Sequence, residues 1–388
     1  MNKQILSELR EKFLKIYSEE PQIITRAPGR LEILGNHTDY NEGLVLSAAV
    51  SQSTYFAVSK SKSSTCKIFS INIGEKPEEF SLVEMEKKVP GDWKNYVKGV
   101  MCEFRKRGIE LQPFNAAVIS DLPLSSGMSS SAAIEVSACM AFEKLFGINL
   151  SPVDRAKIGQ SAENNFVGAK TGLLDQFSSV YGKMDSLILC DFRKNEVLKN
   201  VPLPSGHSFV VINSMKKHDL VDSEYNDRRE SCEKVVKIIS SHDKNIKALR
   251  DLTPATLESY KNILPIFDFR KAMHIVEEND RVLKAVKALN EGNLKIFGEL
   301  LLASHKSSRF NFENSCPELD YLVELSISIP GCLGARLSGG GFGGISIHLV
   351  NDNEVENYIR RIQTAFRLKF GITPQAIICK AGDGAEWL

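Results

Sequence analysis

A stretch of small and hydroxyl-bearing residues, 122–133, lies between two apolar segments of the chain. Residues 114–119 before it are typical of a buried strand, and residues 134–146 after it have the apolar period of a helix. Small side chains let the backbone approach a ligand closely, and free N–H groups at a helix N-terminus bind anions. The pattern favours a phosphate-binding loop, although not a Walker A loop, because no Lys-Ser/Thr pair follows its glycine. A Ser-rich loop that only caps the helix is the alternative.

The segment richest in functional groups is residues 26–43, RAPGRLEILGNHTDYNEG. Its polar side chains include Arg30, Glu32, Asn36, His37, Asp39, Tyr40 and Asn41. A sugar-binding site needs such a set, because each ring hydroxyl both donates and accepts hydrogen bonds. A polar turn between strands is the alternative interpretation. Arginine and histidine so close to Asp39 favour a ligand pocket.

A third glycine-rich segment, SGGGFGG at residues 338–344, precedes the apolar residues 345–349. Glycine-rich turns are common, so this segment alone is a weak signal. Together with a phosphate-binding loop it indicates backbone packed closely around a nucleotide.

The elements that must position these segments mix strands and helices in both halves of the chain. We expect strands at 22–35 (interrupted at Pro28-Gly29), 44–50, 54–58, 66–73, 114–119, 187–190, 209–212, 345–349 and 376–379. We expect helices at 1–20, 92–107, 134–146, from Ser151-Pro152 to about 168, over most of 222–328, and at 354–370. The pattern predicts an α+β protein, with a junction in the Pro- and Gly-containing residues 202–206.

Composition excludes several classes of function. The chain has 388 residues, 43% hydrophobic and 25% charged, with a formal net charge of +1. This balance gives no reason to expect nucleic acid or a membrane as partner, and no run reaches the ~20 apolar residues that span a bilayer. The eight cysteines have neither CxxC nor zinc-site spacing, so we expect reduced, mostly buried thiols in a cytoplasmic protein.

Taken in order, the three segments resemble the three motifs of the GHMP small-molecule kinases. Similarity extends to residues 172–176 (GLLDQ), 223–225 with 228–229, 315–320 and 381–385, so it covers nearly the full length. Residues 36–40, NHTDY, are similar to the branch that phosphorylates galactose-like sugars, which disfavours a mevalonate or homoserine kinase. The resemblance implies a two-domain α+β fold, an N-terminal mixed-sheet domain at 1–203 and a C-terminal domain at 204–388, with the active site in the cleft between them.

The resemblance also implies ATP-dependent phosphorylation of the anomeric C1 hydroxyl of a galactose-like sugar. Asp175 matches the family's base, and Arg30 matches the residue that keeps it ionised and stabilises charge. Ser131 and Glu163 match the Mg²⁺ ligands, with the hard oxygens that this ion needs. The matching sugar-binding residues are Asn36, His37, Thr38, Asp39, Gly172 and Tyr225. The matching nucleotide-binding residues are Ser125, Ser126, Gly127, Met128, Ser129, Ser130 and Ser131.

Several of these residues could also have a purely structural role, and only the resemblance favours a functional one. Asp175 could cap a helix, Glu163 could be an exposed helix residue, and Tyr225 could be a half-buried surface aromatic. Their occurrence at matching places in the chain favours the functional roles.

One departure from the family signature, Gly-Arg-x-Asn-x-x-Gly-Glu-His, concerns the sugar. Here Glu32 and Asn36 have exchanged places. We expect their side chains to lie close together, so that the pocket keeps one carboxylate and one amide. The family's Glu bonds a sugar hydroxyl remote from C1, and an amide would repel a C6 carboxylate less. Galactose, galacturonate and N-acetylgalactosamine therefore stay open as substrates.

A second alternative is a regulatory protein of the same branch that binds sugar and ATP without phosphorylation. Such members lack residues of the phosphate-binding loop, whereas Ser131, Asp175, Arg30 and Glu163 are all present here, which favours the enzyme. We expect a sugar and ATP as partners of a monomer or weak homodimer.

Overall fold

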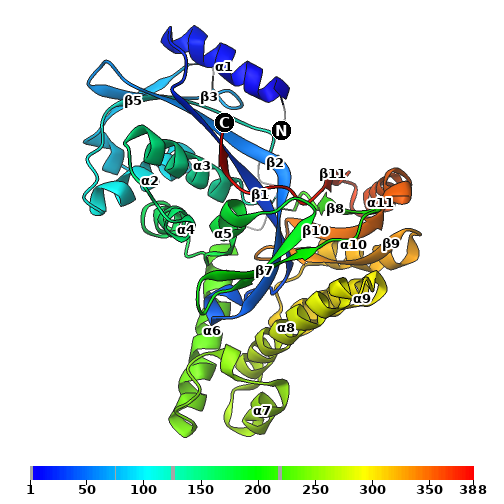
Figure 1. Ribbon diagram of the computed structural model, residues 1–388. Helices are drawn as coiled ribbons and strands as arrows, with labels where there is room; N and C mark the ends of the chain where they lie inside the picture. Colours follow the sequence, from blue (N-terminus) through cyan, green and yellow to red (C-terminus); the bar gives the residue numbers. More distant parts are fainter. Residues whose placement is uncertain (1–2, 75, 124–126, 217–220) are drawn as a thin grey trace.

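The computed structural model describes residues 3–74, 76–123, 127–216 and 221–388, with the side chains of 221–223 left out. Two β-sheets flanked by helices make up the described part (Figure 1). The strands are β1 (Ile23–Leu34), β2 (Leu44–Lys60), β3 (Thr65–Ser70), β4 (Glu78–Ser81), β5 (Phe114–Ser120), β6 (Ser186–Asp191), β7 (Glu196–Pro202), β8 (His207–Asn213), β9 (Cys332–Ser338), β10 (Ile345–Asn351), β11 (Gln375–Cys379) and β12 (Glu386–Trp387). The α-helices are α1 (Lys3–Tyr17), α2 (Lys94–Lys106), α3 (Ser130–Leu145), α4 (Pro152–Ser161), α5 (Leu174–Tyr181), α6 (Val221–His242), α7 (Pro254–Ser259), α8 (Ile266–Asn290), α9 (Leu294–Ser307), α10 (Pro317–Ser328) and α11 (Val355–Phe370).

The larger sheet has the strand order β12-β1-β2-β5-β3-β4, and β6 and β7 join it through β2. Only β3 and β5 pair in parallel among these strands. The amphipathic helix α1 buries Leu9 and Phe13 against Tyr55 and Ile119 on one face. Helices α2 and α3 cover the other face, where Phe142 of α3 joins the core. The sheet is therefore buried on both sides.

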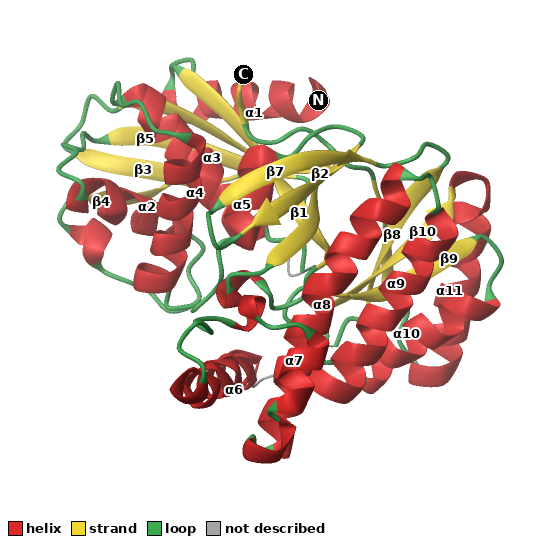
Figure 2. Cartoon of the chain, turned by 60° about the horizontal axis from the view of Figure 1, so that its bottom comes forward, coloured by secondary structure: helices red, strands yellow, loops and turns green. Residues whose placement is uncertain are grey.

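The smaller sheet is antiparallel, in the order β11-β8-β10-β9. Side chains alternate across β8 with the period of a strand. Phe209 and Val211 pack with residues of α8 and α9, whereas Val210 and Ile212 pack with residues of α10 and α11. Figure 2 shows these helices beside the strands that they cover.

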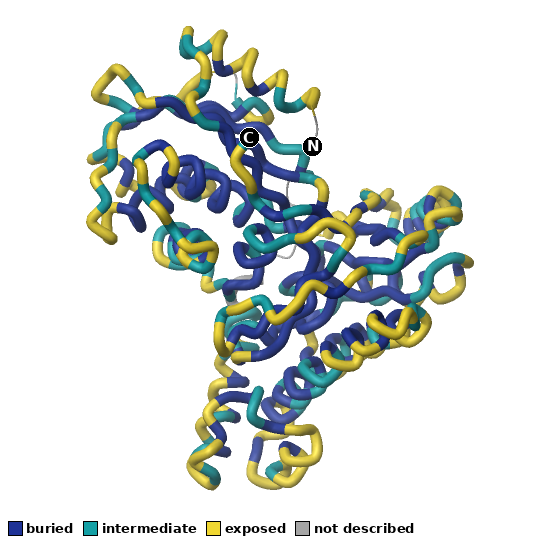
Figure 3. Tube along the Cα trace, viewed as in Figure 1, coloured by how far each residue is buried: buried dark blue, intermediate teal, exposed yellow. Residues whose placement is uncertain are grey.

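One hydrophobic core joins the two sheets. It contains Leu46 of the larger sheet, Ile347 of the smaller sheet and Val282 of α8. After the strands of the smaller sheet, the chain returns to the larger sheet, where β12 pairs with β1. Figure 3 shows buried residues running through both sheets while the outer sides of α6 and α7 are exposed. The predicted α+β class is confirmed, and the change of sheet falls between β7 and β8, while the domain boundary at 203/204 stays a prediction.

The sequence predicted most elements but misjudged some of their limits. The interruption expected at Pro28-Gly29 is wrong: β1 continues through a register shift between Pro28 and Arg30. The strands expected at 44–50 and 54–58 form one strand, β2. Helix α3 begins at Ser130, four residues before the predicted start. The expected helix to 168 is α4 followed by a π-helical turn, Ala162–Val167.

Two further expectations concern thiols and membranes. The structure leaves all eight cysteines unpaired, six of them buried, as expected for a reduced protein. Among the described residues, no helix has both the length and the apolar character that crossing a bilayer requires.

Helix α9 lies so close to β9 that no side chain fits between them. A Cβ at Gly298 would overlap the carbonyl oxygen of Leu333, and a Cβ at Gly334 would overlap that of Gly298. Gly298→Ala should therefore lower the free energy of unfolding by about 1–3 kcal/mol, measured by denaturant titration. Gly74→Ala, whose Cβ meets only ordinary contacts, is the matched control and should change it by less than ~0.5 kcal/mol. Equal effects of the two substitutions would contradict this packing.

Candidate active site

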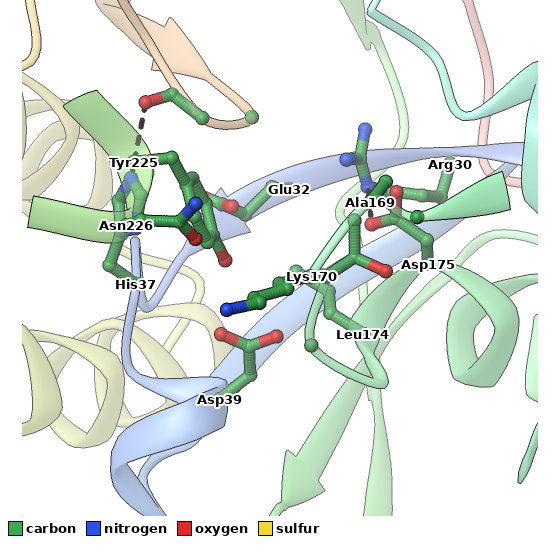
Figure 4. Close-up of a pocket in the computed structure, with 15 residues that line it drawn as sticks. Arg30, Glu32, His37, Asp39, Ala169, Lys170, Leu174, Asp175, Tyr225 and Asn226 are labelled. Carbon is green, nitrogen blue, oxygen red and sulfur yellow. Dashed lines mark hydrogen bonds and ion pairs between the residues drawn. The ribbon is translucent and has the colours of Figure 1, made fainter. Parts of the chain in front are cut away.

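A pocket of about 220 Å³ opens between β1, the loop before α5, the start of α6 and the loop after β9 (Figure 4). The residues that line it are Arg30, Glu32, His37, Asp39, Gly168, Ala169, Lys170, Thr171, Gly172, Leu174, Asp175, Tyr225, Asn226, Gly339 and Gly340. Figure 4 shows Arg30 and Asp175 at one end of this pocket and Glu32, His37 and Tyr225 at the other. Side chains from segments far apart in the sequence thus meet around one small space.

An ion pair forms the first end of the pocket. Arg30 Nε donates to Asp175 Oδ1 at 2.8 Å, and Arg30 Nη1 donates to the carbonyl oxygen of Gly127 at 2.8 Å. Arg30 lies on β1, and Asp175 lies in the first turn of α5, where the helix dipole also favours a negative charge. The arginine is largely buried.

The N-terminus of α3 adjoins this ion pair. Ser129, the residue before α3, has a left-handed backbone (φ 55°) and donates its hydroxyl to Asp175 Oδ2 at 2.5 Å. Ser130 and Ser131 form the first turn of the helix, whose N–H groups have no intrahelical acceptors. An anion at this helix end would lie beside Asp175. The predicted residues Ser125 and Ser126 lie outside the described residues.

Strand β1 approaches this loop so closely that only glycine fits. A Cβ at Gly29 would lie 2.5 Å from the carbonyl oxygen of Met128. The same oxygen accepts a hydrogen bond from the N–H of Arg30 at 3.0 Å. The buried side chain of Met128 anchors the loop in the core. These contacts fix Arg30 relative to the start of α3.

Asp39 lies against Gly172 in the middle of the pocket. A Cβ at Gly172 would overlap the carboxylate of Asp39, so the loop needs glycine here. The N–H of Leu174 donates to the same carboxylate. Burial, with the charges of Glu32 and Asp175, raises the pKa of Asp39 to about 7.

His37 and two tyrosines form the other end. His37 Nε2 lies 3.1 Å from the carbonyl oxygen of Gly340, to which it donates, so its Nδ1 accepts from the Tyr40 hydroxyl at 2.9 Å. Its ring lies 4.9 Å from that of Tyr225. Burial lowers the pKa of His37 to about 4. The histidine is therefore neutral near pH 7.

A second carboxylate, Glu163, lies in the π-helical turn after α4. Its Oε2 accepts from Thr171 Oγ1 at 3.0 Å and from Gln176 Nε2 at 2.9 Å, and Ser131 also hydrogen-bonds this carboxyl group. Burial, followed by the charge of Asp175, raises the pKa of Glu163. Ser131 and Glu163 therefore place two hard oxygen donors together beside the N-terminus of α3.

The structure brings most of the predicted residues together. Arg30, Asp175, His37, Asp39, Gly172 and Tyr225 all line the pocket. Asn36 and Thr38 are fully buried behind it, and Thr38 Oγ1 bonds the carbonyl oxygens of Gly35 and Leu44. The roles assigned to these residues stay predictions.

The sequence did not single out several of the lining residues. Lys170 and Asn226 were not singled out, although each lies within two positions of a predicted residue, Gly172 or Tyr225. Gly339 and Gly340 were assigned to the nucleotide, yet they line this pocket, and their carbonyl oxygens accept from Asn36 and His37. The run of glycines in residues 338–344 was the sequence signal that could have indicated a close approach of this backbone to the pocket.

The chain is similar to known proteins over nearly its full length. Family models match residues 11–60 (galactokinase galactose-binding signature), 95–183 (GHMP kinases N terminal domain) and 285–368 (GHMP kinases C terminal). Galactokinase from Chloroflexus aurantiacus is 37% identical over 381 residues, covering 98% of this chain and 97% of its own length. Galactokinase from Actinobacillus pleuropneumoniae serotype 3 is 40% identical over 381 residues, covering 97% of each.

Solved structures show the same similarity. Lactococcus lactis galactokinase complexed with galactose superposes with a TM-score of 0.94 at 31% identity, covering 99% of this chain and 100% of that one. A mevalonate kinase superposes with a TM-score of 0.64 at 18% identity, covering 92% and 98%, which shows a shared fold. The two-sheet fold is that of a GHMP kinase. Within that class, the chain belongs to the galactokinase family.

The raised pKa of Asp39 predicts a carboxyl group that titrates near neutral pH. With ¹³Cγ-labelled aspartate, one resonance should titrate near pH 7, and it should be absent from Asp39→Asn. Because the folded pKa, about 7, exceeds the ordinary 3.8, this group's contribution to stability is present below pH 4 and is lost as the pH rises through 7. Asp39→Asn should remove that loss. Aspartates that all titrate below about pH 5 would contradict the environment described for Asp39.

Proposed function

We propose that the protein phosphorylates the C1 hydroxyl of galactose with ATP. The observation that carries this proposal is the position of Asp175, held by Arg30 and Ser129 between the sugar-sized pocket and the N-terminus of α3. The family relatives are galactokinases, and the L. lactis structure holds galactose. A base, a cation and an anion-binding helix end in one place fit phosphoryl transfer.

Asp175 and Arg30 have different roles in the transfer of the phosphoryl group. Asp175 accepts the proton of the C1 hydroxyl as that oxygen attacks the terminal phosphorus of ATP. Arg30 keeps the carboxylate oriented and faces the charge that develops on the transferring group. Its Nη1 is held by Gly127, and among the described residues its Nη2 donates no hydrogen bond, which leaves that group for a phosphate oxygen.

The nucleotide phosphates bind at the start of α3. Gly127, Met128, Ser129, Ser130 and Ser131 form this part of the loop, and the positive end of the helix dipole lies there. Mg²⁺ bound here would neutralise phosphate charge, and Ser131 and Glu163 would hold it. No group of three or more metal-binding side chains occurs in the described part of the chain, which fits an ion held mainly by phosphates and water.

The sugar pocket favours neutral hydroxyls over a sugar acid. The carboxylates of Asp39 and Glu32 both line it, and both accept hydrogen bonds from hydroxyl groups. A carboxylate at C6 of the sugar has no proton to donate to these acceptors. The pocket therefore disfavours galacturonate. A purely regulatory role is disfavoured as well, because Asp175, Arg30 and Glu163 all have ordered polar partners.

An ADP-release assay with Mg·ATP tests the proposal over a panel of sugars: galactose, N-acetylgalactosamine, galacturonate, arabinose and glucose. We expect galactose to give the largest kcat/KM, because its hydroxyls match the acceptors of the pocket. Binding of sugar and ATP without ADP release from any sugar would instead support the regulatory role.

The base is tested by Asp175→Asn, which keeps the size of the side chain. Loss of a general base should lower kcat by about 10²- to 10⁴-fold, while galactose binding measured by calorimetry changes far less. Asp185→Asn, at an exposed turn, is the matched control and should keep full activity. A kcat within threefold of the wild type would remove Asp175 from the chemical step.

A further inference from the structure

The exchange of Glu32 and Asn36 has a direct structural counterpart. Asn36 Nδ2 donates to Glu32 Oε1 at 2.7 Å, which confirms the expected proximity of the two side chains. Both residues lie at the end of β1 or just after it, four positions apart. The structure can therefore decide which of the two reaches the sugar.

Asn36 has no hydrogen-bonding capacity left for a ligand. An amide side chain has two N–H donors and an oxygen with two lone pairs. Its Nδ2 donates to Glu32 Oε1 and to the carbonyl oxygen of Gly339, at 2.7 and 2.9 Å. Its Oδ1 accepts from Asn314 Nδ2 at 3.0 Å and from Ser308 Oγ at 3.5 Å. The side chain is completely buried and does not line the pocket.

Glu32, in contrast to Asn36, keeps hydrogen-bonding capacity for a ligand. Its Oε1 accepts from Asn36 and from Arg336 Nη2, the latter at 3.2 Å. Among the residues that the structure describes, nothing donates to its Oε2, and Glu32 lines the pocket. Figure 4 shows it with His37 and Tyr225 at the end away from Asp175. One carboxylate oxygen is thus fixed by protein, and the other is available to a ligand.

A buried cation makes a carboxylate tolerable at this position. Arg336 on β9 is fully buried and lies between Glu32 and Glu278, with its Nη1 also bonded to the carbonyl oxygen of Ile33 at 3.1 Å. Burial raises the pKa of Glu32, and the Arg336 guanidinium opposes that rise. A buried arginine needs such a partner, so Glu32 stays in place when no ligand is bound.

We propose that Glu32 is the residue that selects the sugar: its Oε2 accepts a hydrogen bond from a hydroxyl remote from C1, and Asn36 only positions the carboxylate. This inference rests on the proposed function, which places the C1 hydroxyl at Asp175. The hydroxyls on C4 and on the exocyclic C6 lie across the ring from C1, so they are the ones that reach the opposite end of the pocket. The pocket therefore keeps one free carboxylate, at position 32.

Glu32→Gln tests the inference through its coupling to the substrate. Losing a hydrogen bond to a carboxylate should lower kcat/KM for galactose by about 10- to 100-fold, mostly through KM. That loss should disappear for whichever of 6-deoxygalactose and 4-deoxygalactose lacks the bonded hydroxyl. Glu42→Gln, an exposed carboxylate paired with Arg193, is the matched control and should change none of these ratios.

The outcomes separate the inference from the proposed function. In one outcome, the wild type phosphorylates galactose, and the ratio of kcat/KM for galactose to kcat/KM for each deoxysugar is the same in Glu32→Gln as in the wild type. The inference is then wrong and the function stands. If no sugar is phosphorylated, the function itself fails.

A measurement on the wild type covers the case in which the variant does not fold. The free carboxylate predicts that 6-amino-6-deoxygalactose has a larger kcat/KM than galacturonate. The reverse order would overturn the inference.

Discussion

The active site depends on the ion pair between Arg30 and Asp175. It joins β1 of the larger sheet to the first turn of α5, and through Gly127 it joins both to the start of α3. Ser129 completes the connection from the other oxygen of Asp175. The proposed base, the cation beside it and the N-terminus of α3 are therefore held by one set of contacts. A shift in any one of the three elements would move the others.

The opposite end of the pocket is held by a different kind of constraint, a buried network of charges. Glu278 accepts from the N–H of Gly35 and from Arg281, and it lies 4.0 Å from Arg336. Arg336 in turn pairs with Glu32. These residues come from β1, α8 and β9, so the network also ties the two sheets together. Such buried pairs contribute little net stability, but they fix the direction of a carboxylate that faces the pocket.

Periodicity predicted the long elements well, because each buries one face in a core. It failed where local pattern and tertiary contact disagree. Pro28-Gly29 indicates an interruption, yet β1 continues through a register shift, and glycine occurs there because no side chain fits beside Met128. Helix α5, which carries Asp175, has only eight residues and is too short for a periodic signal. The strands β7 and β9 were also missed.

The site could be predicted only through resemblance to a family. Arg30 and Asp175 are 145 positions apart, and no spacing rule brings them together. The family motif also assigned the sugar contact to position 36, where side-chain geometry instead shows a saturated amide behind a carboxylate. The tautomer of His37 depends on the carbonyl oxygen of Gly340, which only the folded chain brings near. Motifs therefore predicted which segments form the site, and three-dimensional contacts show how its side chains are arranged.

The ion pair implies that Arg30 and Asp175 act as one unit in phosphoryl transfer. A double-mutant cycle on single-turnover rates, with Arg30→Gln, Asp175→Asn and both together, measures their coupling. The double variant should be little slower than the slower single variant, because either substitution already disrupts the unit. Rate losses that multiply would instead show that the two residues act independently.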